Sequence, residues 1–203
     1  MNEYIFLGDS ITDCDHIYDS QSLGNGYVRR IAEKIGFSQN HVINLGYDGF
    51  TIKALNRLWN MRTASLTPSC ITILIGINDI ALIKNTGLNA DQALQEFQEN
   101  YELLIKKIRN TYDGPIILME PFIFTRPAEF LTWKPELKKM GLLIEEICKR
   151  HDLHFLPVWN HLNRAAKMFS TGHITTDGIH LTPEGHIYLA SIWLSFAKEL
   201  QKI

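Results

Sequence analysis

Five short apolar runs, separated by segments of helical periodicity, constrain most strongly what this chain can fold into. The runs are four to six residues long, and they cover residues 4–7, 41–45, 70–75, 116–119 and 154–158. Runs of this length, rich in branched aliphatic residues, are typical of strands buried on both faces of a parallel sheet. Pro157 lies inside the last run, so we expect that strand at an edge of the sheet.

Between these runs, apolar residues recur every three or four positions, which is the spacing of an amphipathic helix. The longest stripe follows Asn89, a capping residue, and comprises Leu94, Phe97, Tyr101, Leu104, Ile105 and Ile108. A short helix is expected around Leu162, Ala165 and Met168, and Thr182-Pro183 is typical of a helix start. Alternating strands and helices predict one α/β domain over residues 1–203, a three-layer α/β/α sandwich around a five-stranded parallel sheet.

Composition excludes several classes of function. The net charge is −2 and the basic residues form no stripe, so the sequence does not predict binding to nucleic acid. No apolar run approaches the ~20 residues of a membrane span, and the first residues lack a basic leader, so we expect a cytoplasmic protein. Three widely spaced cysteines predict neither a disulfide framework nor a zinc site. We expect no metal and no other cofactor.

Three of the apolar runs end in polar turns that contain glycine, at residues 8–10, 44–49 and 76–79. Carboxyl ends of parallel strands meet at one edge of a sheet, where ligands bind, so these turns converge. Ser10 stands in the first turn, where it either caps the next segment or acts as a nucleophile. The loop that contains Asp177 and His180 precedes the last helical segment and is placed to reach the same edge.

Acyl transfer needs a nucleophile, a base, a group that orients the base, and donors for the oxyanion. Ser10 can attack, and His180 is the best base because Asp177, three residues earlier, can accept from its other ring nitrogen. The N–H groups of Ser10 and Gly46, with the side-chain amide of Asn78, are expected to bind the oxyanion. The residues alone therefore favour an acyl hydrolase.

This set of motifs resembles the SGNH hydrolases, the GDSL-type esterase and lipase family. The matching blocks are residues 8–10, 44–49, 76–79 and 177–180. The resemblance implies a flavodoxin-like fold and a catalytic triad of Ser10, His180 and Asp177. It also implies an oxyanion hole from Ser10, Gly46 and Asn78. Asp9 and Asn44 are expected as supporting residues.

A closer resemblance is to the intracellular acetyl-xylan esterase branch of that family. The matching segments are residues 8–14, 24–28, 75–79 and 116–122. The similarity implies a serine esterase that removes O-acetyl groups from xylo-oligosaccharides or a related carbohydrate through an acyl-enzyme. The expected partners are a small acetylated substrate and other copies of the chain, without nucleic acid or membrane.

Other functions stay open at this point. A lysophospholipase or thioesterase would use the same machinery. A metal-dependent phosphoesterase would use carboxylates such as Asp9, Asp13 and Asp79 as ligands, but it leaves Ser10 and Asn78 without a role. A carbohydrate-binding protein without catalysis gives no reason for an Asp-x-x-His pair near a strand-end serine.

Three local features have alternative interpretations. The irregular, aromatic-rich segment 120–133 is a lid, a pocket wall, a subunit contact or simple packing, and for its aromatic residues a pocket wall or a subunit contact is favoured. The acidic loop at residues 13–19 either contacts sugar hydroxyls or is a solvated loop, and the second is favoured. For His186 we expect a structural or surface role.

Overall fold

The sheet of this protein contains five parallel strands in the order β2-β1-β3-β4-β5. The computed structural model describes residues 2–38, 40–62 and 68–200. The strands are β1 (Asn2–Gly8), β2 (Asn40–Gly46), β3 (Cys70–Leu74), β4 (Ile116–Met119) and β5 (His154–Leu156). All five predicted strands are present, and the one that precedes Pro157 lies at an edge, as expected.

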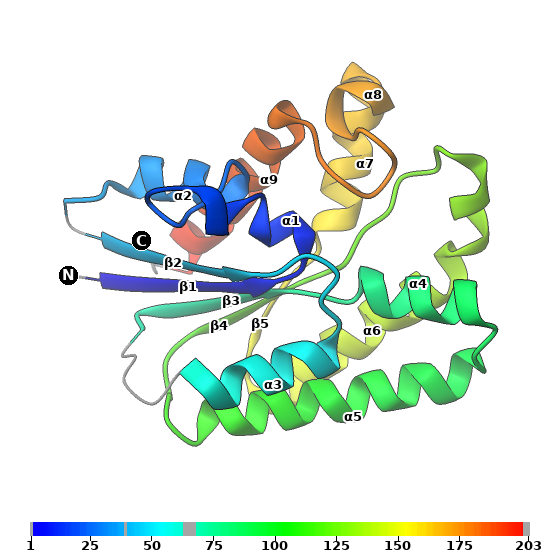
Figure 1. The fold of residues 1–203 in the computed structure, drawn as a ribbon, viewed down its shortest axis with the longest axis horizontal. Coiled ribbons are helices and arrows are strands. Elements are labelled where there is room, and N and C mark those ends of the chain that lie inside the picture. Colours follow the sequence, from blue (N-terminus) through cyan, green and yellow to red (C-terminus); the bar gives the residue numbers. More distant parts are fainter. Residues whose placement is uncertain (1, 39, 63–67, 201–203) are drawn as a thin grey trace.

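Helices cover both faces of the sheet, which gives the three predicted layers (Figure 1). The helices are α1 (Ser10–Asp13), α2 (Tyr27–Ile35), α3 (Ile52–Arg62), α4 (Ile77–Thr86), α5 (Ala90–Arg109), α6 (Lys134–His151), α7 (Val158–Phe169), α8 (Thr171–Ile174) and α9 (Pro183–Glu199), with 3-10 turns η1 (His16–Tyr18) and η2 (Ala128–Thr132). In Figure 1, α3, α5 and α6 lie below the sheet, whereas α1, α2, α7 and α9 lie above it.

Two of the helices, α5 and α9, begin where their sequences predict. The whole predicted stripe of α5 is buried, and Asn89 Oδ1 accepts the Gln92 N–H at 2.9 Å. At the start of α9, the Thr182 hydroxyl accepts the Gly185 N–H at 3.0 Å. The short helix expected around Leu162, Ala165 and Met168 is α7, in which Met168 is 75% exposed. It lies about 240° around the helix from Leu162, away from the face that α7 buries.

The four aromatic rings of the segment between β4 and α6 pack inside the protein, contrary to the pocket wall or subunit contact that we favoured for them. Phe122, Phe124, Phe130 and Trp133 are all buried, so their rings belong to the core. The segment nevertheless reaches the carboxyl edge of the sheet, because the Phe124 N–H donates to the Gly178 carbonyl at 2.8 Å. Within the described residues, no helix combines the length and apolar character that a membrane crossing requires.

Candidate active site

Ser10 occupies the first position of α1, two residues after the end of β1, which is an interior strand of the sheet. Asp9 caps this short helix, since its Oδ1 accepts the Ile11 N–H at 3.1 Å. The chain therefore turns from strand to helix within two residues of Gly8. This turn leaves Ser10 at the carboxyl edge of the sheet, as the sequence predicts.

A chain of hydrogen bonds joins Ser10, His180 and Asp177. Ser10 Oγ lies 2.9 Å from His180 Nε2, and His180 Nδ1 lies 2.7 Å from Asp177 Oδ2. Because the carboxylate accepts from Nδ1, the neutral imidazole keeps its proton there and offers Nε2 to the serine hydroxyl. The structure thus brings together the three residues that the sequence singles out.

The carboxyl group of Asp177 is held by both of its oxygens. While Oδ2 faces the imidazole, Oδ1 accepts the backbone N–H groups of Ile179 at 2.9 Å and His180 at 2.8 Å. Partial burial opposes ionisation of Asp177, but these hydrogen bonds outweigh it and lower the pKa of the group. Asp177 is therefore a fixed acceptor for the histidine.

The aromatic segment at residues 120–133 packs against the loop that carries Asp177 and His180. Gly178 has a φ of +98°, and a methyl group there would lie 2.1 Å from the Arg126 carbonyl oxygen. The Thr175 hydroxyl accepts the Gly178 N–H at 2.9 Å and donates to the His180 carbonyl at 2.7 Å. Only glycine allows this backbone conformation and this close approach.

The prediction that Gly46 donates its N–H to the oxyanion is wrong for this structure. That N–H already donates to Asn44 Oδ1 at 2.9 Å, and Gly46 is paired with Gly8 inside the sheet. A methyl group on Gly46 would lie 2.2 Å from the Asp13 backbone nitrogen. The glycine is required because the end of α1 packs directly on β2.

Asn44 supports the site as predicted, by connecting three segments. Its Nδ2 donates to the Thr12 carbonyl at 2.7 Å and to the Leu23 carbonyl at 2.9 Å, while its Oδ1 receives the Gly46 N–H. Asn44 is 3% exposed, so these bonds form where water cannot compete for them. The side chain holds α1 against β2.

The second glycine of the same motif, Gly49, offers the available backbone donor. It is exposed, and its N–H has no acceptor among the described residues. On one side, the Asp48 N–H donates to Asp13 Oδ2 at 3.0 Å. On the other side, the Phe50 carbonyl accepts from Asn78 Nδ2 at 3.0 Å. These bonds place Gly49 beside Asn78, whose amide keeps a second hydrogen for the oxyanion.

Two carboxyl groups lie under the site, with Asp9 buried and Asp79 partly buried. Burial raises the pKa of Asp9 and that of Asp79 to about 7 each. Asp9 caps α1, and Asp79 Oδ2 accepts the Ile52 N–H at 3.2 Å. Both groups therefore hold backbone at the edge of the sheet. Among the described residues, no cluster of three or more His, Cys, Asp or Glu side chains is arranged to hold a metal ion.

The acidic loop after Ser10 is largely structural, contrary to the solvated loop that we expected. Asp13 is 9% exposed, and its Oδ1 lies 2.7 Å from His16 Nδ1. Asp19 accepts the Leu23 N–H at 2.9 Å and pairs with Arg29 at 2.5 Å. Asp15 is exposed. Sequence reasoning missed the part that Asp13 plays in holding the Asp48–Phe50 loop, although Asp13 stands in the first motif.

His186 is buried and has the structural role that we favoured. Its Nδ1 accepts the Tyr27 N–H at 3.2 Å, so its proton is on Nε2, which faces Cys14 Sγ at 3.2 Å. Burial lowers the pKa of His186 to about 4 and raises that of Cys14 to about 12. Both groups are thus neutral at pH 7 and do not compete with His180 as a base.

A cavity of about 400 Å³ opens beside the serine. Its walls come from the loops after β1 and β2 and from the start of α9. The lining residues are Ser10, Ile11, Asp13, Cys14, Asp15, Ile17, Tyr18, Asp48, His180, Leu181 and His186. Its size suits a small molecule, and the serine and histidine face it.

Two known proteins are similar to this chain in sequence. An acetylxylan esterase from Geobacillus stearothermophilus is 26% identical over 204 residues, which cover 94% of this chain and 91% of that protein. An N-acylneuraminate cytidylyltransferase from Streptococcus agalactiae is 24% identical over 85% of this chain, but over only 38% of its own length.

Solved structures agree with the architecture. A catalytic variant of an acetylxylan esterase from Geobacillus stearothermophilus superposes with a TM-score of 0.82 at 22% identity, covering 96% of this chain and 93% of that one. An alpha/beta hydrolase from the metagenome of Lake Arreo gives a TM-score of 0.81 at 23% identity, with 96% and 94% covered. The model of the GDSL-like lipase/acylhydrolase family matches residues 6–187. The chain belongs to this family and is a carboxylic ester hydrolase.

Proposed function

We propose that this protein is a serine esterase that removes O-acetyl groups from a carbohydrate, such as a xylo-oligosaccharide. The observation that carries the proposal is the chain of short contacts from Ser10 Oγ through His180 to Asp177, at 2.9 and 2.7 Å. Such a chain is the arrangement that activates a serine for acyl transfer. The acetylxylan esterase among the relatives supports acetyl as the acyl group.

In the first half of the reaction, Ser10 Oγ attacks the carbonyl carbon of the ester and its proton passes to His180 Nε2. The negative charge that develops on the carbonyl oxygen is bound by the N–H groups of Ser10 and Gly49 and by the Asn78 amide. Asp177 stabilises the imidazolium. The bond to the sugar oxygen then breaks, and His180 returns the proton to that oxygen.

In the second half, water attacks the acetyl group on Ser10. His180 Nε2 takes a proton from this water, and the same donors bind the second oxyanion. Collapse of the intermediate releases acetate, and the proton returns to Ser10 Oγ. The ester and one water molecule supply all the atoms of the two products, and Ser10 and His180 end in their starting states.

A substrate panel tests the proposal. The panel compares acetylated xylose, acetylated glucosamine, a longer-chain ester and an acyl thioester, with and without a chelator. We expect acetate release from the acetylated sugars, unchanged by chelator and absent in Ser10→Ala. Preference for the long-chain ester or the thioester would instead support a lysophospholipase or thioesterase. Loss of activity with chelator would support a metal-dependent phosphoesterase.

The expected cytoplasmic location and homo-oligomer stay predictions. The oligomeric state is measured by light scattering of the purified protein over a range of concentrations.

A further inference from the structure

We propose that the catalytic cavity selects acetyl esters of uncharged or cationic carbohydrates and rejects anionic ones, with Asp15 and Asp48 as the residues that determine this specificity. The inference rests on the proposed esterase function and names the substrate class of the same site. Three aspartates line the cavity, two of them have no ion-pair partner, and exposed apolar side chains lie beside them.

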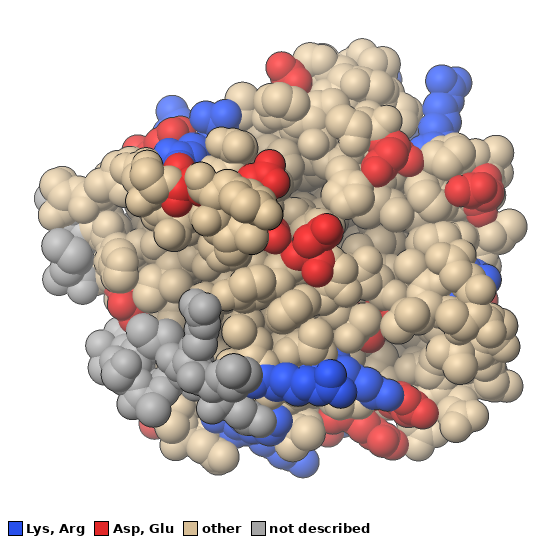
Figure 2. Space-filling model, in the orientation of Figure 1, with Lys and Arg blue, Asp and Glu red and all other residues tan. Residues whose placement is uncertain are grey.

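The cavity contains three aspartates and neither lysine nor arginine among its described lining residues. His186 adds no positive charge, since burial lowers its pKa to about 4 and its Nδ1 accepts the Tyr27 N–H. Figure 2 shows acidic side chains in the middle of the face where the strands end in Figure 1, with lysine and arginine toward the margins. An anionic substrate therefore meets no opposite charge there.

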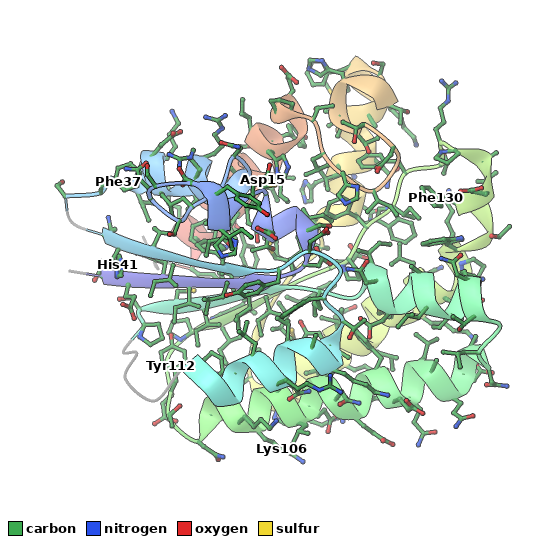
Figure 3. All side chains as sticks on the ribbon, in the orientation of Figure 1. Asp15, Phe37, His41, Lys106, Tyr112 and Phe130 are labelled. Carbon is green, nitrogen blue, oxygen red and sulfur yellow. The ribbon has the colours of Figure 1, made fainter. Side chains whose placement is uncertain are left out.

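The three aspartates differ in how far their oxygens are already used. Asp13 is buried, with Oδ1 at His16 and Oδ2 at the Asp48 N–H, so its carboxyl group belongs to the scaffold. Asp15, on the loop after α1 (labelled in Figure 3), and Asp48 are both exposed. Neither carboxyl group has an ion-pair partner within the described chain, so both are available to a substrate.

The nearby basic side chain of Arg29 does not neutralise them. It donates to Asp19, to Gln21 Oε1 at 2.8 Å and to the Gly24 carbonyl at 2.6 Å. These bonds fix the guanidinium behind the acidic loop. The negative charges of Asp15 and Asp48 are thus left without a basic partner from Arg29.

An apolar surface adjoins these carboxyl groups. Ile17 and Tyr18, on η1, line the cavity and are 60% and 84% exposed. Carboxylate oxygens accept from sugar hydroxyls, and an aromatic ring offers a flat face to the C–H face of a sugar. A polyol satisfies both features, whereas a carboxylate or phosphate at the same place is repelled by like charge.

A matched pair of substrates tests the inference on the intact protein. One is an O-acetylated methyl glucoside, and the other is the corresponding methyl glucuronoside, which differs by a carboxylate at C6. At ~20 mM salt we expect kcat/KM to be about tenfold lower for the anionic ester, because like charges oppose its entry. At ~500 mM salt the ratio should shrink, because exposed charges are then screened.

The variant Asp15→Asn/Asp48→Asn should bring the ratio of the two kcat/KM values close to one at low salt. Glu99→Gln, which removes one carboxylate from α5 on the other side of the sheet, serves as the control and should keep the wild-type ratio. Equal kcat/KM for both esters in the wild-type protein at low salt overturns the inference, as does an unchanged ratio in the double variant.

Turnover of p-nitrophenyl acetate separates this inference from the proposed function. If that ester is hydrolysed while the charged pair is not distinguished, only the specificity proposal fails. If neither the sugar esters nor p-nitrophenyl acetate are hydrolysed, both the proposed esterase function and the specificity proposal are wrong.

Discussion

The two carboxylate oxygens of Asp177 accept from different donors. Replacing even one of these oxygens by an NH₂ group therefore changes the hydrogen bond to His180. Oδ1 accepts two backbone N–H groups and Oδ2 accepts His180 Nδ1. The two backbone groups can only donate, so whatever atom faces them must be an acceptor. The remaining atom of the side chain then decides which nitrogen of His180 carries the proton.

Asp177→Asn should therefore lower kcat by a factor on the order of 10⁴. The asparagine oxygen will stay with the two backbone N–H groups, which turns its NH₂ toward His180 Nδ1. The histidine proton then moves to Nε2, where it blocks transfer from Ser10. Steady-state kinetics with p-nitrophenyl acetate measure the loss, and ¹⁵N NMR of His180 reports the tautomer. A variant with near wild-type kcat would show that Asp177 does not set the tautomer.

Asn78→Ala should lower kcat by a factor on the order of 10²–10³ with little change in KM, since its free amide hydrogen serves the transition state alone. The bond from Asn78 to the Phe50 carbonyl is also lost, so the loop that carries Gly49 becomes less fixed. Asn78→Asp is the matched comparison. It keeps the size of the side chain but offers no donor, and it should be at least as impaired. Equal losses in kcat and in affinity would contradict a role confined to the oxyanion.

At this scale the sequence predicts that Ser10, His180 and Asp177 lie together, because Asp177 and His180 are three residues apart and form their own local turn. The sequence does not predict that the Gly46 N–H is already bonded inside the protein. Gly46 and Gly49 both stand in one motif, and only the structure tells that the Asn44 side chain already accepts the Gly46 N–H. A pattern of residue types does not reveal which backbone groups are already bonded.

At the level of the elements, α1 is a helix of only four residues that packs directly on β2. Its C-terminal end meets β2 at Gly46, where a side chain has no room. Short elements of this kind have no periodicity, so the sequence shows the strand before Ser10 but not how tightly the following helix returns onto the sheet. The stripe of α5 was predictable for the opposite reason, since six apolar residues repeat at helical spacing.

Gly46→Ala should lower the free energy of unfolding by about 1–3 kcal/mol, because the methyl group would force α1 away from β2. The same shift should move Ser10 and reduce turnover. Gly172→Ala is the control, since a methyl group there has no neighbour within 4 Å. Urea unfolding of both variants measures the difference. A Gly46→Ala protein as stable as the control would mean that α1 can be displaced without cost.

For the molecule as a whole, the carboxyl groups that lie under the site make stability depend on pH. Burial raises the pKa of Asp79 from its ordinary value of 3.8 to about 7. Between these values the folded protein keeps a proton that the unfolded chain has released. The contribution of Asp79 to stability is therefore fully present below about pH 4 and is lost as the pH rises to about 7.

Asp79→Asn should flatten this dependence. The amide oxygen can still accept the Ile52 N–H, but the side chain no longer titrates. The free energy of unfolding of the wild-type protein should decline relative to the variant by at most about 1.4 kcal/mol per pH unit in this window. Urea titrations followed by tryptophan fluorescence between pH 4 and pH 8 give both curves. Parallel curves would show that Asp79 is ionised throughout.

The contact between Ser10 and His180 joins residues that are 170 positions apart. The nucleophile is synthesised 170 residues before its base. Ser10 therefore lacks its base until the loop before α9 has been made and docks on the sheet. Ester turnover thus reports completion of the fold, and its recovery after dilution from denaturant would time the last step of folding.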